Sequence, residues 1–202
     1  MSVFIAVGIP GVGKTSVINE ALKLAADKGL DVVVVNYGDK MVEEAVKHGW
    51  ISGPEDRDKM RKLPINVQVD LQVKAAESIH NIAKDSGKIV IVDTHVFIRT
   101  PYTFLPGIPN YVLDALKPRG IIVIVANPED VASRRAKDKD IRDRDVEAVA
   151  SIKLHQDLTL YGAAAVSIFS GANLVVIENK EGQLNEAAER FFGALMSISG
   201  KG

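Results

Sequence analysis

Residues 8–15, GIPGVGKT, have the composition and spacing of a loop that binds nucleotide phosphates. Gly8, Gly11 and Gly13 allow a tight backbone turn whose N–H groups converge into a nest for an anion. Lys14 supplies a mobile positive charge for the β- and γ-phosphates, and the Thr15 hydroxyl is a natural Mg²⁺ ligand. We therefore expect nucleotide contacts along the whole loop, from Gly8, Ile9, Pro10, Gly11, Val12, Gly13, Lys14, Thr15 and Ser16.

The segments on either side of the loop support this interpretation. Residues 3–7 are all apolar and predict a buried strand, and residues 14–28 predict a helix. The positive end of that helix dipole would lie at the same point as the nest. The alternative, a glycine-rich turn with a chance lysine, is disfavoured by this strand–loop–helix context.

A second chemical signal is Asp93, which ends the apolar run 89–93, IVIVD. A carboxylate at the end of a strand, downstream of a phosphate loop, is expected to bind Mg²⁺ directly or through water, together with Thr15. The alternative is a helix cap or a turn aspartate. The next residue is Thr94 rather than a glutamate that would activate water, which favours transfer to a bound acceptor over hydrolysis.

Two arginine-rich segments could bind further phosphate groups. Arg57 and Arg61 lie four residues apart in the segment 55–62, on one face of an expected helix, where they could clamp a second substrate or simply be solvated. The segment 134–145, RRAKDKDIRDRD, could be a short lid whose arginines close over the transferred phosphate, or an exposed charged connection. Its candidate catalytic residues are Arg134, Arg135, Arg142 and Arg144.

Residues 100–109, TPYTFLPGIP, predict a stiff and partly apolar loop that could form the floor of a base pocket. Arg99 precedes it and could reach an acceptor phosphate. His95 lies near the expected site, but we interpret it as a hydrogen-bonding residue, because a phosphate acceptor is already anionic and needs no base.

Short apolar runs alternate with helical patterns along the whole chain. Strands are expected at 3–7, 32–36, 89–93, 121–126 and 173–178, and helices at about 14–28, 39–48, 55–86 with a break near Pro64, 109–116, 128–139, 143–170 and 183–198. Runs that are apolar throughout are typical of parallel strands covered on both faces. The pattern predicts one α/β domain over residues 1–202, a three-layer fold in which helices flank a five-stranded parallel sheet. Ligands of such sheets bind at the carboxyl ends of the strands.

Composition limits the function classes. The 202 residues carry a net charge of −1, which gives no reason to expect nucleic-acid binding through a basic surface. The sequence has no cysteine, which excludes disulfides and thiolate metal sites. No apolar run is long enough to span a bilayer, and the first residues lead directly into a strand rather than a leader segment. We expect a cytoplasmic protein with no membrane association.

Several stretches together resemble the archaeal adenylate kinases, which have the P-loop nucleoside triphosphatase fold. They are GIPGVGKT, VNYGDKM, EDRDKMRKL, VDTH followed by IRTP and LPGIP, RRAKDKDIRDRD, LHQ at 154–156, and SGANLVVIENKEG. They occur in order over nearly the whole chain. Two local departures are Tyr102-Thr103-Phe104, where the family usually has a glycine followed by a tyrosine, and a lid about one residue longer.

The resemblance implies reversible, Mg²⁺-dependent phosphoryl transfer from ATP to AMP, giving two ADP. It also implies an AMP-binding helical segment at about 37–75, a short lid at about 134–145, and a homotrimer formed through the helix at 143–170. Lys14 and the loop would hold ATP, and the lid arginines would act on the transferred phosphate. Carried over by position, the AMP-binding residues are Arg57, Arg61, Arg99 and Gly38.

Three alternatives remain from the sequence. The acceptor could be CMP, UMP or GMP, since base choice depends on one or two hydrogen bonds. A GTPase-type switch is suggested by residues 179–182, NKEG, but Gly182 stands where a guanine-binding carboxylate is needed. A non-catalytic nucleotide-binding scaffold is the third.

Overall fold

Five parallel strands form the central sheet, and each coincides with one of the expected apolar runs. The computed structural model describes residues 2–137 and 149–200. The strands are β1 (Ser2–Val7), β2 (Val32–Asn36), β3 (Ile89–Asp93), β6 (Gly120–Val125) and β7 (Asn173–Glu178), in the spatial order β2-β3-β1-β6-β7. In the register of the sheet, Ala6 of β1 lies opposite Asp93 of β3 and Ile122 of β6. The carboxyl ends of the three central strands therefore meet at one edge.

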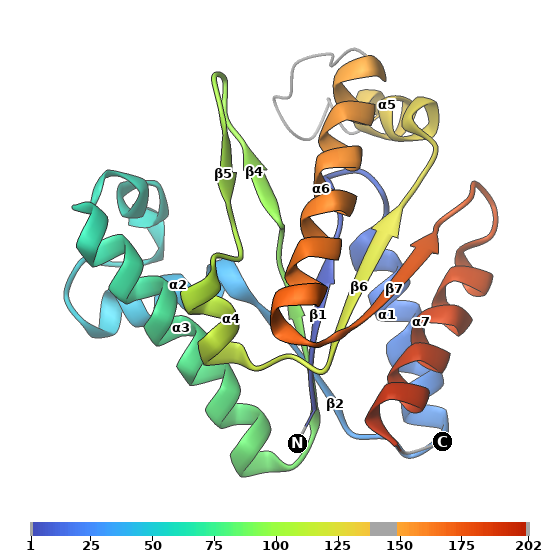
Figure 1. Ribbon diagram of the computed structural model, residues 1–202, viewed down its shortest axis with the longest axis horizontal. Coiled ribbons are helices and arrows are strands. Elements are labelled where there is room, and N and C mark those ends of the chain that lie inside the picture. The colour runs from blue at the N-terminus through green and yellow to red at the C-terminus, as the bar shows by residue number, and fades with distance from the viewer. Residues whose placement is uncertain (1, 138–148, 201–202) are drawn as a thin grey trace.

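Helices cover both faces of this sheet, as expected for parallel strands (Figure 1). Val3, Ile5 and Val7 of β1 pack in the core below α3 (Ile65–Ser86), α4 (Asn110–Leu116) and α6 (Val149–Ser170). Phe4 and Ala6 face the opposite core, which includes residues of α1 (Lys14–Asp27), α5 (Pro128–Lys137) and α7 (Leu184–Ser199). The alternation of side chains along β1 thus divides the apolar residues between two cores.

A small unit of α2 (Tyr37–Lys47), the 3₁₀ helix η1 (Pro54–Lys62) and the start of α3 extends beyond the sheet on one side (Figure 1). It has its own core of Val42, Ala45, Ile51, Met60 and Leu71. Asn36 caps α2, because its Oδ1 accepts a hydrogen bond from the Asp39 N–H at 3.1 Å. The expected helix at 55–62 is 3₁₀ rather than α, since Met60 is its one buried residue and it has no apolar face to pack.

Residues 97–106 form an antiparallel hairpin where a loop was expected. Its strands are β4 (Phe97–Arg99) and β5 (Phe104–Pro106), with Ile98 paired to Leu105. The turn is closed by Thr100, whose Oγ1 accepts from the Thr103 N–H at 2.9 Å. The hairpin projects from the carboxyl edge of the sheet, between the α2–η1–α3 unit and α6 (Figure 1).

The remaining boundaries agree with the expectations to within a few residues. The helix expected at 128–139 is described to Lys137, and the one expected at 143–170 is described from Val149. Most of the expected lid at 134–145, including Arg142 and Arg144, lies outside the described residues. Among the helices that are described, none has the length and apolar character needed to cross a membrane.

Candidate functional site

The loop between β1 and α1 leads into a helix start that can bind a phosphate through its backbone N–H groups. Gly13 is the residue before α1, with φ of 83°, a left-handed conformation that glycine adopts without strain. It offers no side-chain cap, and the first turn of α1 has no acidic residue. The N–H groups of that turn therefore remain available to an anion, and the helix dipole favours a negative charge there.

Lys14 lies between this loop and the end of β3. Its Nζ donates to the Thr94 carbonyl at 3.1 Å and forms an ion pair with Asp93 Oδ1. The Lys14 side chain is 10% exposed and that of Asp93 is 15% exposed. Burial lowers the pKa of Lys14 to about 8. The loop lysine and the aspartate of the sequence motif are thus brought into direct contact.

Asp93 and Thr15 bring hard oxygen atoms to the same edge of the sheet. Asp93 Oδ1 is buried and accepts no hydrogen bond from the described residues, and the charge facing it is Lys14 Nζ. Thr15 lies in the first turn of α1. Such ligands fit Mg²⁺, but no group of three or more His, Cys, Asp or Glu side chains among the described residues could hold a metal. Mg²⁺ here would need phosphate oxygens as additional ligands, as is usual for this ion.

The last turn of α5 places two arginines against the same loop. Arg135 donates from Nε and Nη2 to the Pro10 carbonyl, at 2.9 and 2.6 Å. Arg134 donates from Nη1 to the Val12 carbonyl at 3.4 Å and from Nη2 to Glu181 at 2.6 Å. Two of the four expected lid arginines therefore lie at the phosphate loop.

Asn179, which follows β7, is a site residue that the sequence motifs did not identify as such. Its Nδ2 donates to the Val12 carbonyl at 2.8 Å, and its own backbone N–H bonds to Val125. A Cβ atom on Gly13 would overlap Asn179 Nδ2, so a larger residue there would displace this side chain, besides being strained at a φ of 83°. The signal in the sequence was a polar residue directly after an apolar strand, but Asn179 was included only in the guanine motif and in one stretch of the family resemblance, with no role of its own.

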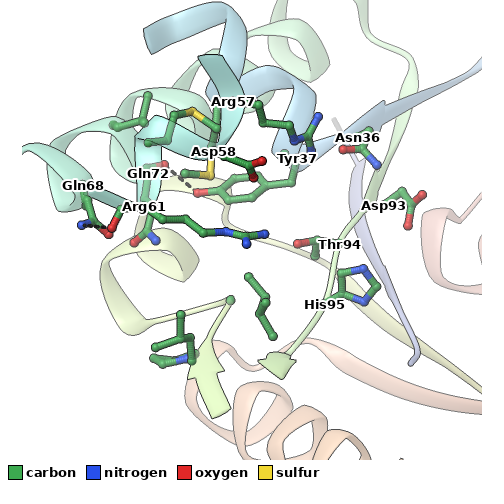
Figure 2. Close-up of a pocket in the computed structure, with 18 residues that line it drawn as sticks. Asn36, Tyr37, Arg57, Asp58, Arg61, Gln68, Gln72, Asp93, Thr94 and His95 are labelled. Carbon is green, nitrogen blue, oxygen red and sulfur yellow. Dashed lines mark hydrogen bonds between the residues drawn. The ribbon is translucent and has the colours of Figure 1, made fainter. Parts of the chain in front are cut away.

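A cavity of about 380 Å³ opens beside the loop, between the sheet edge, the α2–η1–α3 unit and the hairpin (Figure 2). Arg57 and Arg61 line it from η1, and Asp93, Thr94 and His95 line it from the end of β3. The cavity therefore brings the first arginine pair of the sequence prediction next to residues that contact Lys14. A ligand phosphate in this cavity could meet the guanidinium groups of Arg57 and Arg61.

Gly38 and Asp39 determine where Arg57 lies. A Cβ atom on Gly38 would be 2.3 Å from Arg57 Nη2, so a larger residue would displace the guanidinium. Arg57 Nη1 forms an ion pair with Asp39 Oδ1. The start of α2 thus holds the arginine at the cavity wall.

Arg99 does not line this cavity. It lies on β4, and its charge, with that of Arg135, lowers the pKa of His155, although burial of the imidazole is the larger cause. His155 Nε2 lies 3.2 Å from the Phe97 carbonyl and so joins α6 to the hairpin. The structure thus groups Arg57 with Arg61 and places Arg99 nearer the α5–α6 side.

His95 supports the phosphate loop. Its Nδ1 lies 2.9 Å from the Gly8 carbonyl, which can only accept, so Nδ1 carries the proton. Burial, followed by the charge of Lys14, lowers the pKa of His95 to about 4. The imidazole is therefore neutral near pH 7, in agreement with a hydrogen-bonding role.

Relatives of the chain are adenylate kinases. A sequence profile described as "AAA domain" matches residues 7–153. The adenylate kinase of Methanothermobacter thermautotrophicus is 41% identical over 96% of this chain and 100% of its own length, and that of Methanopyrus kandleri is 40% identical over 97% and 98%. The chain belongs to the adenylate kinase family. This adenylate kinase is a phosphotransferase that acts on nucleoside monophosphates.

The fold agrees with this assignment. A crystal structure of an unliganded sugar kinase from Janibacter sp. HTCC2649 superposes on it with a TM-score of 0.53 at 17% identity, over 98% of this chain and 95% of that one. At that identity the likeness concerns the fold alone. The adenylate kinase thus has the three-layer kinase architecture, with its phosphate loop and its arginine-lined cavity at one sheet edge.

Proposed function

We propose that the phosphate loop holds Mg·ATP and the arginine-lined cavity holds AMP, so that the terminal phosphoryl group passes between them to give two ADP. The single observation that carries this division is the position of Asp93 and Thr94. They line the cavity and also contact Lys14 of the phosphate loop. The two phosphate sites are therefore contiguous, which in-line transfer requires.

On the donor side, the backbone N–H groups of the loop and the ammonium of Lys14 would bind the β- and γ-phosphates. Thr15 and Asp93 would hold Mg²⁺, directly or through water, and the ion would neutralise charge that develops on the phosphate oxygens. Arg134 and Arg135 would turn from loop carbonyls and Glu181 toward the transferred phosphate, with Arg142 and Arg144 completing the lid at 134–145. This movement would exclude water from the reaction.

On the acceptor side, the segment 37–75 would bind AMP. Arg57 and Arg61 would hold its phosphate, with Gly38 making room for Arg57. Arg99 lies outside the lining of the cavity, so it would reach the same phosphate only through a movement of the hairpin toward Arg57 and Arg61. A phosphate oxygen of AMP is already anionic and would attack directly, so the neutral His95 has no proton to remove.

We also infer that the protein acts in the cytoplasm as a homotrimer. Leu154, Tyr161 and Ile168 of α6 are exposed at 53, 69 and 79%, and their spacing of seven residues places them along one side of the helix. Large apolar side chains in such a row favour burial against another copy of the chain.

The donor–acceptor division is tested by an alanine variant on each side. Arg57→Ala should raise the KM for AMP by about tenfold or more and leave the KM for ATP unchanged. The expected factor follows because a hydrogen bond to a charged group is worth about 1.5–3 kcal/mol. Lys14→Ala should lower kcat by orders of magnitude and leave the fold intact. Lys62→Ala is the matched control, because Lys62 lies on η1 beside Arg61 but does not line the cavity.

Equal effects of Arg57→Ala on the KM values for AMP and ATP would contradict the assignment of the cavity to the acceptor. ADP formation from AMP, CMP, UMP and GMP with the same ATP concentration measures the preference of the unmodified protein. A preference led by another nucleotide would contradict AMP as the acceptor.

A further inference from the structure

Two glutamines one helical turn apart on α3 line the cavity beyond the arginines. Gln68 and Gln72 are four residues apart and therefore lie on the same face of the helix. The surrounding cavity wall is apolar, with Met41 and Leu71 on one side and Ile98 on the hairpin. Figure 2 shows both glutamines on the side of the cavity away from Asn36 and Asp93. A nucleotide whose phosphate meets the arginines would place its base here.

The amide of Gln68 can present only one of its two ends to a base. Its Nε2 donates to the Leu63 carbonyl at 2.7 Å and to the Arg61 carbonyl at 3.3 Å. Both partners are backbone carbonyls, which accept and never donate, so the nitrogen must face them. Gln68 Oε1 is then left as a hydrogen-bond acceptor.

The amide of Gln72 is held in the opposite sense. Its Oε1 accepts from the hydroxyl of Tyr111 at 2.6 Å, which leaves Nε2 as the free donor. The helix backbone at the same position is also secured, since the Tyr37 hydroxyl donates to the Gln72 carbonyl at 2.7 Å. Burial raises the pKa of both tyrosines, so their hydroxyls stay protonated as donors at neutral pH.

We propose that Gln68 and Gln72 select the acceptor base by its amino group. Gln68 Oε1 accepts from an exocyclic amino group, and Gln72 Nε2 donates to the adjacent unprotonated ring nitrogen. Tyr111 is the positioning residue, since its hydroxyl holds Gln72 by donating to Oε1. The inference rests on the proposed function, because it requires a nucleoside monophosphate with its phosphate at Arg57 and Arg61.

This acceptor–donor pair divides the bases into two groups. Adenine and cytosine carry an amino group beside an unprotonated ring nitrogen, which matches the pair at both points. Hypoxanthine and uracil have no amino group and carry a carbonyl beside a ring N–H, so both contacts become acceptor against acceptor and donor against donor. A site built to hydrogen-bond one pattern discriminates strongly against its reverse. CMP is therefore expected to be the second-best substrate, although cytosine fills less of the cavity than adenine.

The first test is kcat/KM of the unmodified enzyme with AMP, CMP, IMP and UMP at saturating Mg·ATP. AMP should exceed IMP, and CMP should exceed UMP, each by about tenfold or more. The second comparison matters most, because CMP and UMP are almost identical in size. Equal values for CMP and UMP would overturn the proposal even if AMP is the best substrate of all.

Variants separate base reading from structural support. Gln68→Leu and Gln72→Leu should lower kcat/KM for AMP by about tenfold or more and change that for IMP far less. Tyr111→Phe keeps both glutamines but removes the hydroxyl that holds the Gln72 amide. It should therefore reduce the ratio of kcat/KM for AMP to kcat/KM for IMP. Asn81→Leu is the control, an amide-to-leucine change at an exposed position of α3 away from this cavity.

Two kinds of failure can be distinguished. If the glutamine variants change kcat/KM for AMP and IMP by the same factor, the glutamines only support α3 and the proposal is wrong. If instead the unmodified protein forms no ADP from AMP, or Arg57→Ala leaves the KM for AMP unchanged, the assignment of the cavity itself fails.

Discussion

Burial of Lys14 makes the donor site sensitive to pH at the scale of a single residue. Its pKa is lowered to about 8, so the ammonium form that binds phosphate is present below that pH and is lost above it. We predict that kcat/KM for ATP falls as pH rises through about 8, because this ratio reports groups of the free enzyme. The fall in kcat itself should begin at a higher pH, since bound phosphates favour the charged lysine.

Measurement between about pH 7 and 9.5 avoids the ionisation of the nucleotide phosphates, whose second pKa is near 6. His95 stays neutral over this range, because its pKa is about 4, and adds no second step. The KM for AMP serves as the control and should not follow the same curve. A kcat/KM for ATP that is flat across pH 8 would show that the lysine remains charged in the free enzyme.

At the scale of elements, the loop after β7 supports the loop after β1. Asn179 donates to the Val12 carbonyl, and Glu181, two residues on, binds Arg134. Arg134 and the phosphate loop thus both depend on the connection after β7. The hairpin β4–β5 is joined to α6 in a comparable way, through His155 and the Phe97 carbonyl.

We predict that Asn179→Ala removes the contact that holds the phosphate loop. The buried Val12 carbonyl loses a donor, which costs about 1–3 kcal/mol in the free energy of unfolding. The KM for ATP should rise as the protein loses this stability, while the KM for AMP stays unchanged. Denaturant unfolding and steady-state kinetics measure the two effects. Asn173→Ala is the matched control: Asn173 lies at the opposite end of β7, and its Nδ2 makes a longer contact of 3.4 Å, with the Arg119 carbonyl. Similar losses of stability and similar KM values for both variants would refute a specific role of Asn179.

At the scale of the whole molecule, the exposed apolar side of α6 is the feature a monomer does not explain. We predict that light scattering after gel filtration gives three times the chain mass of 21.8 kDa. Ile168→Glu should shift this mass toward the monomer, because a charge would be buried in an apolar contact. Ile65→Glu is the control, an equally exposed isoleucine on α3 at 80% against 79% for Ile168. A monomeric unmodified protein would exclude the homotrimer.

Much of this molecule follows from local sequence. The five strands are apolar throughout because both faces of a parallel sheet are covered, and such runs can be recognised directly. The phosphate loop can also be recognised directly, because its chemistry depends on residue types at fixed neighbouring positions. Arg57 and Arg61 share a cavity, but not for the reason that their spacing suggested, because η1 is a 3₁₀ helix, in which residues four apart do not lie on one face. The hairpin at 97–106 was missed because its strands have three residues each, too few to establish a period of two.

The sequence by itself therefore determined the sheet, the phosphate loop and the resemblance to adenylate kinases, all of which are encoded in contiguous residues. Tertiary structure decided which distant groups meet: Lys14 with Asp93, Asn179 with Val12, and Tyr111 with Gln72. It also placed Arg99 outside the lining of the cavity that Arg57 and Arg61 share. The two residues of each contacting pair named above are 39 to 167 positions apart in the sequence. Chain folding alone brings such residues together, and no local pattern records hydrogen bonds made across that distance.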